Sequence, residues 1–460
     1  MPPIKQIILN AFTMNCVGHI NHGLWAHPRD RSHEYKTLRY WTDLARTLER
    51  GLFDGLFLAD IVGVYDIYQN SVDLTLRESI QLPVNDPMLL VSGMASVTDN
   101  LGFGITVNTS VEAPYTFARK ISTLDHLTSG RICWNIVTGY LDSAAKALGK
   151  TGMTEHDTRY DQTDDYMDLL YKLWEGSWEE GAVRLDKQAR IYADPAKVHK
   201  VQHHGPYYQS EGYHLCEPSI QRTPVLYQAG TSGRGRKFAA RHAECVFIGA
   251  TDKAAARKTA QSLREEVVAA GRHPDDIKIF LGVTVVTDKS REAAADKLED
   301  YRRYASPEAG LAHFSAGSGI DLSRYELDDP IQYGPTNAIQ SVTQLAKQKG
   351  WTKRQLLNEL SIGGRYPLIT GGPGEVAEEL ISWIDEGDID GFNLTRAVTP
   401  ESYEDFIEFV VPELQSRGAY KTSYGQGSLR HRLFGEGNRL PTRHADSRYR
   451  DCLITCPSAE

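Results

Sequence analysis

The chain has 460 residues, of which 41% are hydrophobic and 24% charged, and its formal net charge is -9. These are ordinary values for a globular protein, and the acidic balance argues against nucleic-acid binding, because phosphate backbones require a basic surface. No apolar run is long enough to span a bilayer, and the first residues lack the pattern of a signal peptide. We therefore expect a cytoplasmic protein with neither a nucleic-acid nor a membrane partner.

The six cysteines are spread along the chain, and only Cys452 and Cys456 lie close together in sequence. No CxxC pair or group of histidines accompanies them, so the sequence predicts neither a metal site nor a disulfide framework. We expect reduced thiols.

Short apolar segments alternate with longer amphipathic ones along most of the chain. The short segments are rich in β-branched or aromatic residues and are bounded by Gly, Pro, Asp or Asn, as buried parallel strands are. They comprise residues 6–12, 55–59, 101–107, 131–137, 224–229, 245–248, 277–286 and 391–394. This order predicts an α/β protein with a (β/α)8 TIM barrel over residues 1–420. An open doubly wound sheet is the alternative, but no GxGxxG motif follows the first strand.

Three of the intervening segments carry clear helix signals. Residues 35–50 place apolar side chains on one face and stop before a glycine, and residues 372–386 also have one apolar face. Residues 400–417 follow Thr399, which we expect to be the N-cap, with Pro400 at the first helical position.

Three stretches, residues 62–87, 174–223 and 304–371, are too long for plain barrel loops. Because barrel active sites lie at the carboxyl ends of the strands, we expect these insertions there, enclosing a substrate. Residues 421–460 form a polar tail with basic runs, which we expect to pack along the surface or in a subunit contact.

The fifth predicted strand ends in a turn rich in Gly and Ser that leads into a helix. The turn comprises Ala229, Gly230, Thr231, Ser232 and Gly233. It would expose several backbone N–H groups at the positive end of the helix, which suits a phosphate monoester, and Arg234 or Arg236 could add charge. A plain glycine-rich loop is the alternative.

Other polar residues stand where a barrel site would form. Asp60, Thr106, Asn108, Asn135 and Thr138 lie at or just after strand ends, where a polar side chain is costly unless it has a partner. Hydrogen bonds to neighbouring loops are the alternative for each of them.

Two further pairs have the spacing of site residues. His156 and Tyr160 stand four apart and can share a helix face toward a cofactor, whereas the alternative is a polar helix start that Asp157 caps. Cys16 and His19 suggest a nucleophile, but no third partner is evident, so we interpret them as pocket lining.

Several motifs together resemble the bacterial-luciferase superfamily of flavin monooxygenases, in the branch of the nitrilotriacetate and dibenzothiophene-sulfone enzymes. The motifs are LARTLERG at 44–51, FD at 53–54, STLDHL at 122–127, WNIVT at 134–138 and QAG at 228–230. Within this branch the chain is most similar to the long-chain alkane and dimethyl-sulfide monooxygenases. Its pocket residues resemble those of the alkane enzyme at Cys16, His19, Tyr65 and His313. Tyr140 stands where that enzyme has a histidine, which changes the acid–base character and volume of the pocket.

The resemblance implies a two-component enzyme that uses FMN. A separate NAD(P)H:flavin reductase would supply FMNH2, which reacts with O2 to give a flavin hydroperoxide. This species would insert one oxygen atom into a small, largely apolar substrate, either an alkane or an organosulfur compound. The protein would supply orientation and a dry cavity, as a homodimer or homotetramer.

The resemblance also implies a role for each candidate residue. The turn at 230–233 and Tyr160 would hold the phosphate. The flavin ring and the ribityl chain would lie along Asp60, Thr106, Asn135, Thr138 and His156. The substrate pocket would be formed by Tyr65, His19, Tyr140, His313 and Cys16.

Two other functions remain open from the sequence. A non-catalytic flavin-binding relative would bind FMN without substrate-dependent oxygen consumption. A barrel glycoside hydrolase would use two carboxylates, such as Asp60 and Glu112, and would have no affinity for flavin.

Overall fold

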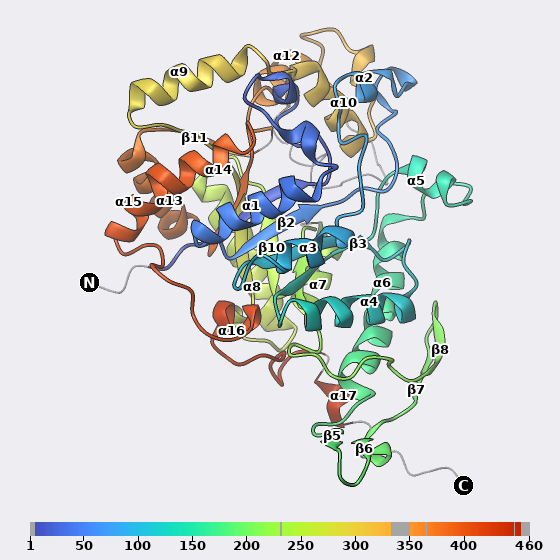
Figure 1. Ribbon diagram of the computed structural model, residues 1–460. Helices are drawn as coiled ribbons and strands as arrows, with labels where there is room; N and C mark the ends of the chain where they lie inside the picture. Colours follow the sequence, from blue (N-terminus) through green and yellow to red (C-terminus); the bar gives the residue numbers. More distant parts are fainter. Residues whose placement is uncertain (1–4, 231, 333–349, 365, 446, 452–460) are drawn as a thin grey trace.

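The structure is a computed structural model that describes residues 5–230, 232–332, 350–364, 366–445 and 447–451. Its centre is a closed barrel of eight parallel strands, which confirms the predicted (β/α)8 fold (Figure 1). The strands are β1 (Ile8–Met14), β2 (Gly55–Ala59), β3 (Gly102–Asn108), β4 (Ile132–Val137), β9 (Val225–Gln228), β10 (Cys245–Ile248), β11 (Lys278–Thr287) and β13 (Gly391–Thr395). They pair in this order, and β13 closes the ring against β1. Within the described residues, no helix is long and apolar enough to cross a membrane.

The interior of the barrel is filled by aromatic rings rather than left as a channel. Phe12 stacks on Phe57 with ring centroids 5.0 Å apart, and Phe57 stacks on Phe247 at 4.4 Å. Tyr227 meets Phe247 edge to face. Because side chains alternate along each strand, the opposite faces of these strands pack against the outer helices. A ligand therefore has room only above this aromatic layer.

The outer helices form where apolar periodicity and caps predicted them. α1 (Leu38–Arg50) begins after Thr37, whose hydroxyl accepts a hydrogen bond from the backbone N–H of Tyr40, and it buries Trp41 against the barrel. α13 (Pro373–Gly387) occupies the segment predicted at 372–386.

The predicted helix over residues 400–417 differs from the structure at its start and in its middle. It consists of α14 (Glu401–Asp405), a π-helical turn (Phe406–Val410) and α15 (Val411–Ser416). The prediction that Thr399 is the N-cap was wrong, because its hydroxyl accepts a hydrogen bond from Arg396 and Pro400 precedes the helix. The Ser402 hydroxyl instead accepts hydrogen bonds from the backbone N–H groups that precede the helix.

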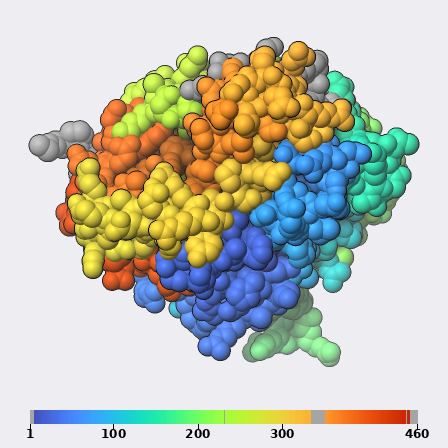
Figure 2. Space-filling model, turned by 90° about the horizontal axis from the view of Figure 1, so that it is seen from above, coloured from blue at the N-terminus to red at the C-terminus, as the bar shows by residue number. Residues whose placement is uncertain are grey.

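Two of the predicted insertions lie above the carboxyl ends of the strands. Residues 62–87 contain α2 (Asp73–Arg77). The described part of residues 304–371 contains α10 (Pro307–Ser318), α12 (Lys353–Glu359) and the short strand β12 (Leu368–Gly371), which pairs with β11. α10 packs against α2, so the two insertions lie side by side (Figure 2).

The third insertion does not enclose a substrate. It runs from the end of α6 (His156–Tyr171) to β9, and it therefore leads into the amino end of a strand. It forms two hairpins, β5 (Val183–Asp186) with β6 (Ile191–Ala193) and β7 (Val201–His204) with β8 (Gln209–Gly212), which project away from α10 and α12 in Figure 1. The prediction that residues 174–223 enclose the site was wrong, because helix-to-strand connections lie at the opposite end of the barrel.

The polar tail reaches into the core instead of remaining on the surface. α16 (Leu429–Phe434) places Leu429 and Leu433 against Cys133 and Cys245, near the amino ends of β4 and β10. Between these leucines, the buried Arg430 donates from Nε to the Glu244 carboxylate at 2.7 Å. The expectation of a surface position was wrong for this helix, because its many charged residues gave no indication that two leucines and an ion pair are buried.

Candidate active site

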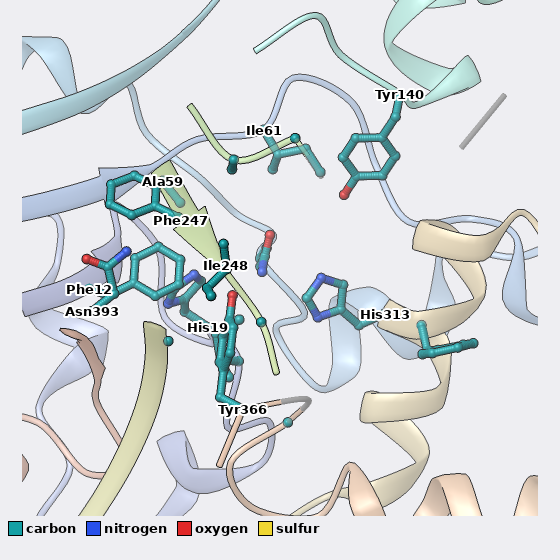
Figure 3. A pocket seen from close by; sticks show the side chains of 18 of the residues that line it. Phe12, His19, Ala59, Ile61, Tyr140, Phe247, Ile248, His313, Tyr366 and Asn393 are labelled. Carbon is teal, nitrogen blue, oxygen red and sulfur yellow. The ribbon is translucent and has the colours of Figure 1, made fainter. Parts of the chain in front are cut away.

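A cavity of about 680 Å³ lies above the aromatic layer, at the carboxyl ends of the strands. Figure 3 shows side chains from the barrel strands on one side of it and His313, from the insertion helix α10, on the other. The sequence-predicted residues in its wall are His19, Asp60, Tyr65, Thr106, Asn135, Thr138, Tyr140, His156, Tyr160, Ala229, Gly230, Ser232 and His313. One cavity therefore joins residues that lie far apart in the sequence.

The amino end of α7 (Gly233–His242) forms one end of the cavity, here called the α7 end. The Ser232 hydroxyl caps this helix by accepting a hydrogen bond from the backbone N–H of Gly235 at 3.0 Å. The Nε2 of His156 lies 3.4 Å from the same hydroxyl. A Cβ on Gly230 would crowd the side-chain ends of Gln228 and Tyr160, so glycine lets these groups approach the turn closely. These groups surround a positive helix end, which suits an anion.

Two residues of the predicted turn do not contribute to the described wall. Gly233 is exposed at the start of α7 and does not line the cavity, and Thr231 lies outside the described residues.

The positive charge near this end does not come from Arg234. Its guanidinium pairs with Asp161 at 2.9 Å and with Asp164, and it lies over the Tyr160 ring. Arg159, which the sequence analysis did not single out, lines the cavity instead. Because charged residues are frequent on helices, no feature of the local sequence distinguishes this arginine from its charged neighbours.

Polar groups at the strand ends form the middle of the cavity. Asn135 donates a hydrogen bond from Nδ2 to the hydroxyl of Thr106 at 2.9 Å, while its Oδ1 is buried with no partner among the described residues. The Oε1 atom of Gln228 is also buried with no hydrogen-bond partner among the described residues. A buried acceptor without a donor is costly, so both atoms are positioned for a ligand that donates hydrogen bonds.

Asp60 also lies in the middle of the cavity. Burial raises the pKa of its carboxyl from 3.8 to about 7, and the nearby Asp86 adds to the effect, although a hydrogen bond from the backbone of Ile61 opposes it. The group can therefore change its charge near neutral pH.

Aromatic side chains with polar tips form the other end of the cavity, here called the tyrosine end. The hydroxyl of Tyr65 donates to Oε1 of Gln81 at 2.7 Å and lies 3.1 Å from the hydroxyl of Tyr140. The ring of His313 stacks on that of Tyr65, with centroids 5.0 Å apart. Gln81 had no recognisable signal in the sequence, because it stands alone within a long insertion.

His22 does not line the cavity, but its side chain contacts the side chain of His313. Its Nε2 lies 3.0 Å from Nδ1 of His313. The sequence analysis did not identify His22, because nothing in the local pattern links it to residue 313.

Cys16 lies beside the cavity rather than in its wall. Its thiol is buried and donates to the carbonyl of Gly18 at 3.1 Å, and burial raises its pKa to about 12. A thiol in this state is not a nucleophile near neutral pH.

Asp60 and Glu112, the carboxylates considered for a glycoside hydrolase, do not meet at this site. Glu112 pairs with Lys120 at 2.9 Å and is not among the residues of the cavity wall, so Asp60 lacks that partner.

The residues present fit a flavin nucleotide. The α7 end offers a helix amino terminus for a phosphate, and the middle offers unpartnered acceptors at Asn135 and Gln228 for groups that donate hydrogen bonds. Apolar side chains from Phe12 and Phe247 supply a water-excluding floor.

Comparison with known proteins agrees with this geometry. Residues 20–388 match the family described as luciferase-like monooxygenase. The chain is 49% identical to the long-chain alkane monooxygenase of Geobacillus thermodenitrificans over 97% of this chain and 98% of that protein. It is 48% identical to the dimethyl-sulfide monooxygenase of Hyphomicrobium sulfonivorans over 98% of this chain and 95% of that protein.

Solved structures show the same relationship. The crystal structure of DmoA from Hyphomicrobium sulfonivorans superposes with a TM-score of 0.92 over 99% of both chains, at 48% identity. That of a riboflavin lyase, with modified FMN and riboflavin as substrate, superposes with a TM-score of 0.92 at 38% identity, over 97% of this chain and 100% of that one. This chain belongs to the luciferase-like monooxygenase family.

Proposed function

We propose that the protein is a two-component monooxygenase that binds reduced FMN and inserts one atom of O2 into a small, largely apolar substrate. The observation that carries this proposal is the single cavity, which runs from an anion-binding helix end to an aromatic pocket. The names of the similar proteins favour an alkane or an organosulfur compound as substrate. Reduced FMN, delivered by a separate NAD(P)H:flavin reductase, would supply the two electrons and activate O2.

The α7 end is proposed to hold the phosphate of FMN. The backbone N–H groups of the first turn and the side chains of Ser232, His156 and Tyr160 converge there. Arg159 lies at the same end and adds positive charge. The middle of the cavity would orient the rest of the nucleotide, with Asn135 and Gln228 accepting hydrogen bonds.

The tyrosine end is proposed to hold the substrate. Its walls are aromatic and apolar, which suits a molecule with little polarity, and the hydroxyls of Tyr65 and Tyr140 bond to each other. The described parts of the two insertions above the barrel line this end, which would help to keep water from the reacting groups.

The proposal can be tested with reduced FMN generated by an unrelated flavin reductase. Dimethyl sulfide, alkanes of several chain lengths and a sulfone would each be supplied under 18O2. One of these substrates is expected to yield a product that carries a single 18O atom, detected by mass spectrometry. FMN binding without any oxygenated product would favour the non-catalytic relative, and an absence of flavin binding would overturn the proposal altogether.

A further inference from the structure

His22 and His313 form a histidine pair whose protonation states are linked. Nε2 of His22 lies 3.0 Å from Nδ1 of His313, and the two rings are nearly perpendicular at 81°. At this distance one nitrogen must carry the proton and the other must accept it. The tautomer of His22 therefore determines that of His313, which faces the cavity.

The position of His22 is fixed by its backbone and its neighbours. Its carbonyl accepts a hydrogen bond at 2.9 Å from the backbone N–H of Ser306, the N-cap of the helix that carries His313. A Cβ at the next residue, Gly23, would lie 2.4 Å from the carbonyl oxygen of Tyr304, and its φ is 87°, so only glycine allows this close approach. The imidazole of His22 is thus held against α10.

The side chain of the preceding residue fastens the same segment to the barrel. Asn21 donates from Nδ2 to the carbonyl of Arg396 at 2.7 Å and accepts from the backbone N–H of Gly363 at 2.6 Å. His22 therefore sits on a stretch of chain that is bonded on both sides.

Burial decides which nitrogen of His22 carries the proton. The residue is 1% exposed, and its Nδ1 has no hydrogen-bond partner among the described residues. A buried N–H group without an acceptor is disfavoured more strongly than a bare lone pair, so the proton belongs on Nε2. Burial also lowers the pKa of His22 to about 4, which keeps the ring neutral.

We propose that His22 is a positioning residue that fixes His313 as the neutral tautomer with its proton on Nε2. The Nε2–H of His22 donates to Nδ1 of His313, so Nδ1 of His313 cannot hold a proton of its own. The proton of His313 then lies on Nε2, at the ring edge away from His22, so the ring is a neutral hydrogen-bond donor and not a cation. His313 would act as a hydrogen-bond donor toward a bound molecule and not as a general base.

The tautomer can be measured without any substrate. In protein labelled with 15N-histidine, the two ring nitrogens of His313 report whether the proton is on Nε2 or Nδ1 near neutral pH. We expect the Nε2–H form in the wild type, a mixture in His22→Leu, and recovery of the Nε2–H form in His22→Gln, whose amide can also donate. A wild-type signal from the Nδ1–H form or from the doubly protonated ring would overturn the proposal, whatever the variants do.

His27 provides a matched control on the same segment. It is also buried, at 3% exposed, and its Nε2 bonds to Asp300 at 3.0 Å rather than to His313. His27→Leu should leave the His313 signals unchanged. If it alters them as much as His22→Leu does, the effect is a general loss of packing, and the proposal fails.

A second readout connects the tautomer with the reaction and rests on the proposed function. With dimethyl sulfide and FMNH2 as probes, loss of the donor at His22→Leu should lower the ratio of oxygenated product to hydrogen peroxide by about tenfold, and His22→Gln should restore most of it. If the wild type oxygenates no probe, the proposed function is in question, while the tautomer measurement still stands alone. An unchanged product ratio in a His22→Leu protein with an altered tautomer would rule out the role of His313 as a donor.

Discussion

The hydroxyl of Tyr140 donates its hydrogen bond to the hydroxyl of Tyr65. The two oxygens lie 3.1 Å apart, and the single proton of Tyr65 is directed to Oε1 of Gln81 at 2.7 Å, so Tyr140 must be the donor of the pair. This bond joins the insertion after β2 to the loop after β4 across the tyrosine end of the cavity.

Exchange of Tyr140 should change substrate preference without affecting flavin binding. Tyr140→His shortens the side chain and moves its polar atoms, so the relative rates for dimethyl sulfide and for alkanes should differ from those of the wild type. FMN affinity should stay the same, because the α7 end is formed by other residues. Product ratios from mixed substrates, together with a flavin titration, check both statements.

Tyr140→Phe is the control for this prediction, because it keeps the ring and removes the hydroxyl that bonds to Tyr65. Identical substrate profiles for the wild type and both variants would show that Tyr140 does not shape the pocket.

A negative charge at residue 232 should selectively weaken binding of the phosphate group. Ser232→Asp keeps a side-chain acceptor for the cap of α7, because aspartate is also a good N-cap, but it repels a phosphate. We expect the Kd for FMN to rise on the order of tenfold or more, which is about 1.4 kcal/mol. Riboflavin, which lacks the phosphate, should bind to both proteins equally well. Equal losses for both flavins would place the phosphate elsewhere.

The carboxyl of Asp60 should make stability depend on pH in an unusual direction. Its pKa is raised to about 7 in the folded protein, whereas an unfolded chain returns it to about 3.9. Between these values the folded state binds more protons, so the free energy of unfolding falls as the pH rises from about 4 to 7 and then levels off. Asp60→Asn should remove the contribution of this carboxyl to the decline in stability. The Tm of both proteins, measured from pH 4.5 to 8, checks this.

Asp405 gives the matched control for that experiment. Burial raises its pKa to about 6, so Asp405→Asn should remove a decline that ends about one pH unit lower. If both variants change the pH profile in the same range, the assignment to Asp60 is wrong.

Loss of the buried arginine in the tail should destabilise the whole barrel. Arg430→Ala leaves the Glu244 carboxylate buried without its partner, and breaking such a pair costs about 3–5 kcal/mol in the free energy of unfolding. Urea denaturation measures this cost. Arg354→Ala, which breaks an exposed pair with Asp328, should have a much smaller effect, because exposed ion pairs contribute little to stability. Similar costs for the two variants would show that Arg430 is not part of the core.

The barrel could be predicted because its strands are marked by their composition. Segments 55–59 and 245–248 coincide with β2 and β10, and the other six predicted strands differ by two residues or fewer at either end. The shortest strands gave no such signal. β12 and the strands of the two hairpins have only three or four residues each, which is too few for a pattern to be recognised, and the side chains of β5 and β6 are mostly exposed.

The candidate site could be predicted in part, because polar residues at strand ends and a Gly-Ser turn are local features. Asp60, Asn135 and Ser232 all reach the cavity. Two other residues of the site could not be predicted in the same way. His22 and Gln81 matter through contacts with residues that are distant in the sequence, and only the fold brings each one to its partner.

The short helix α16 covers the amino ends of β4 and β10, although it follows all eight barrel strands in the sequence. The apolar base around Cys133 and Cys245 therefore cannot be covered until every strand has been synthesised. A chain that lacks α16 would expose this apolar ring, and an exposed patch of that kind favours aggregation.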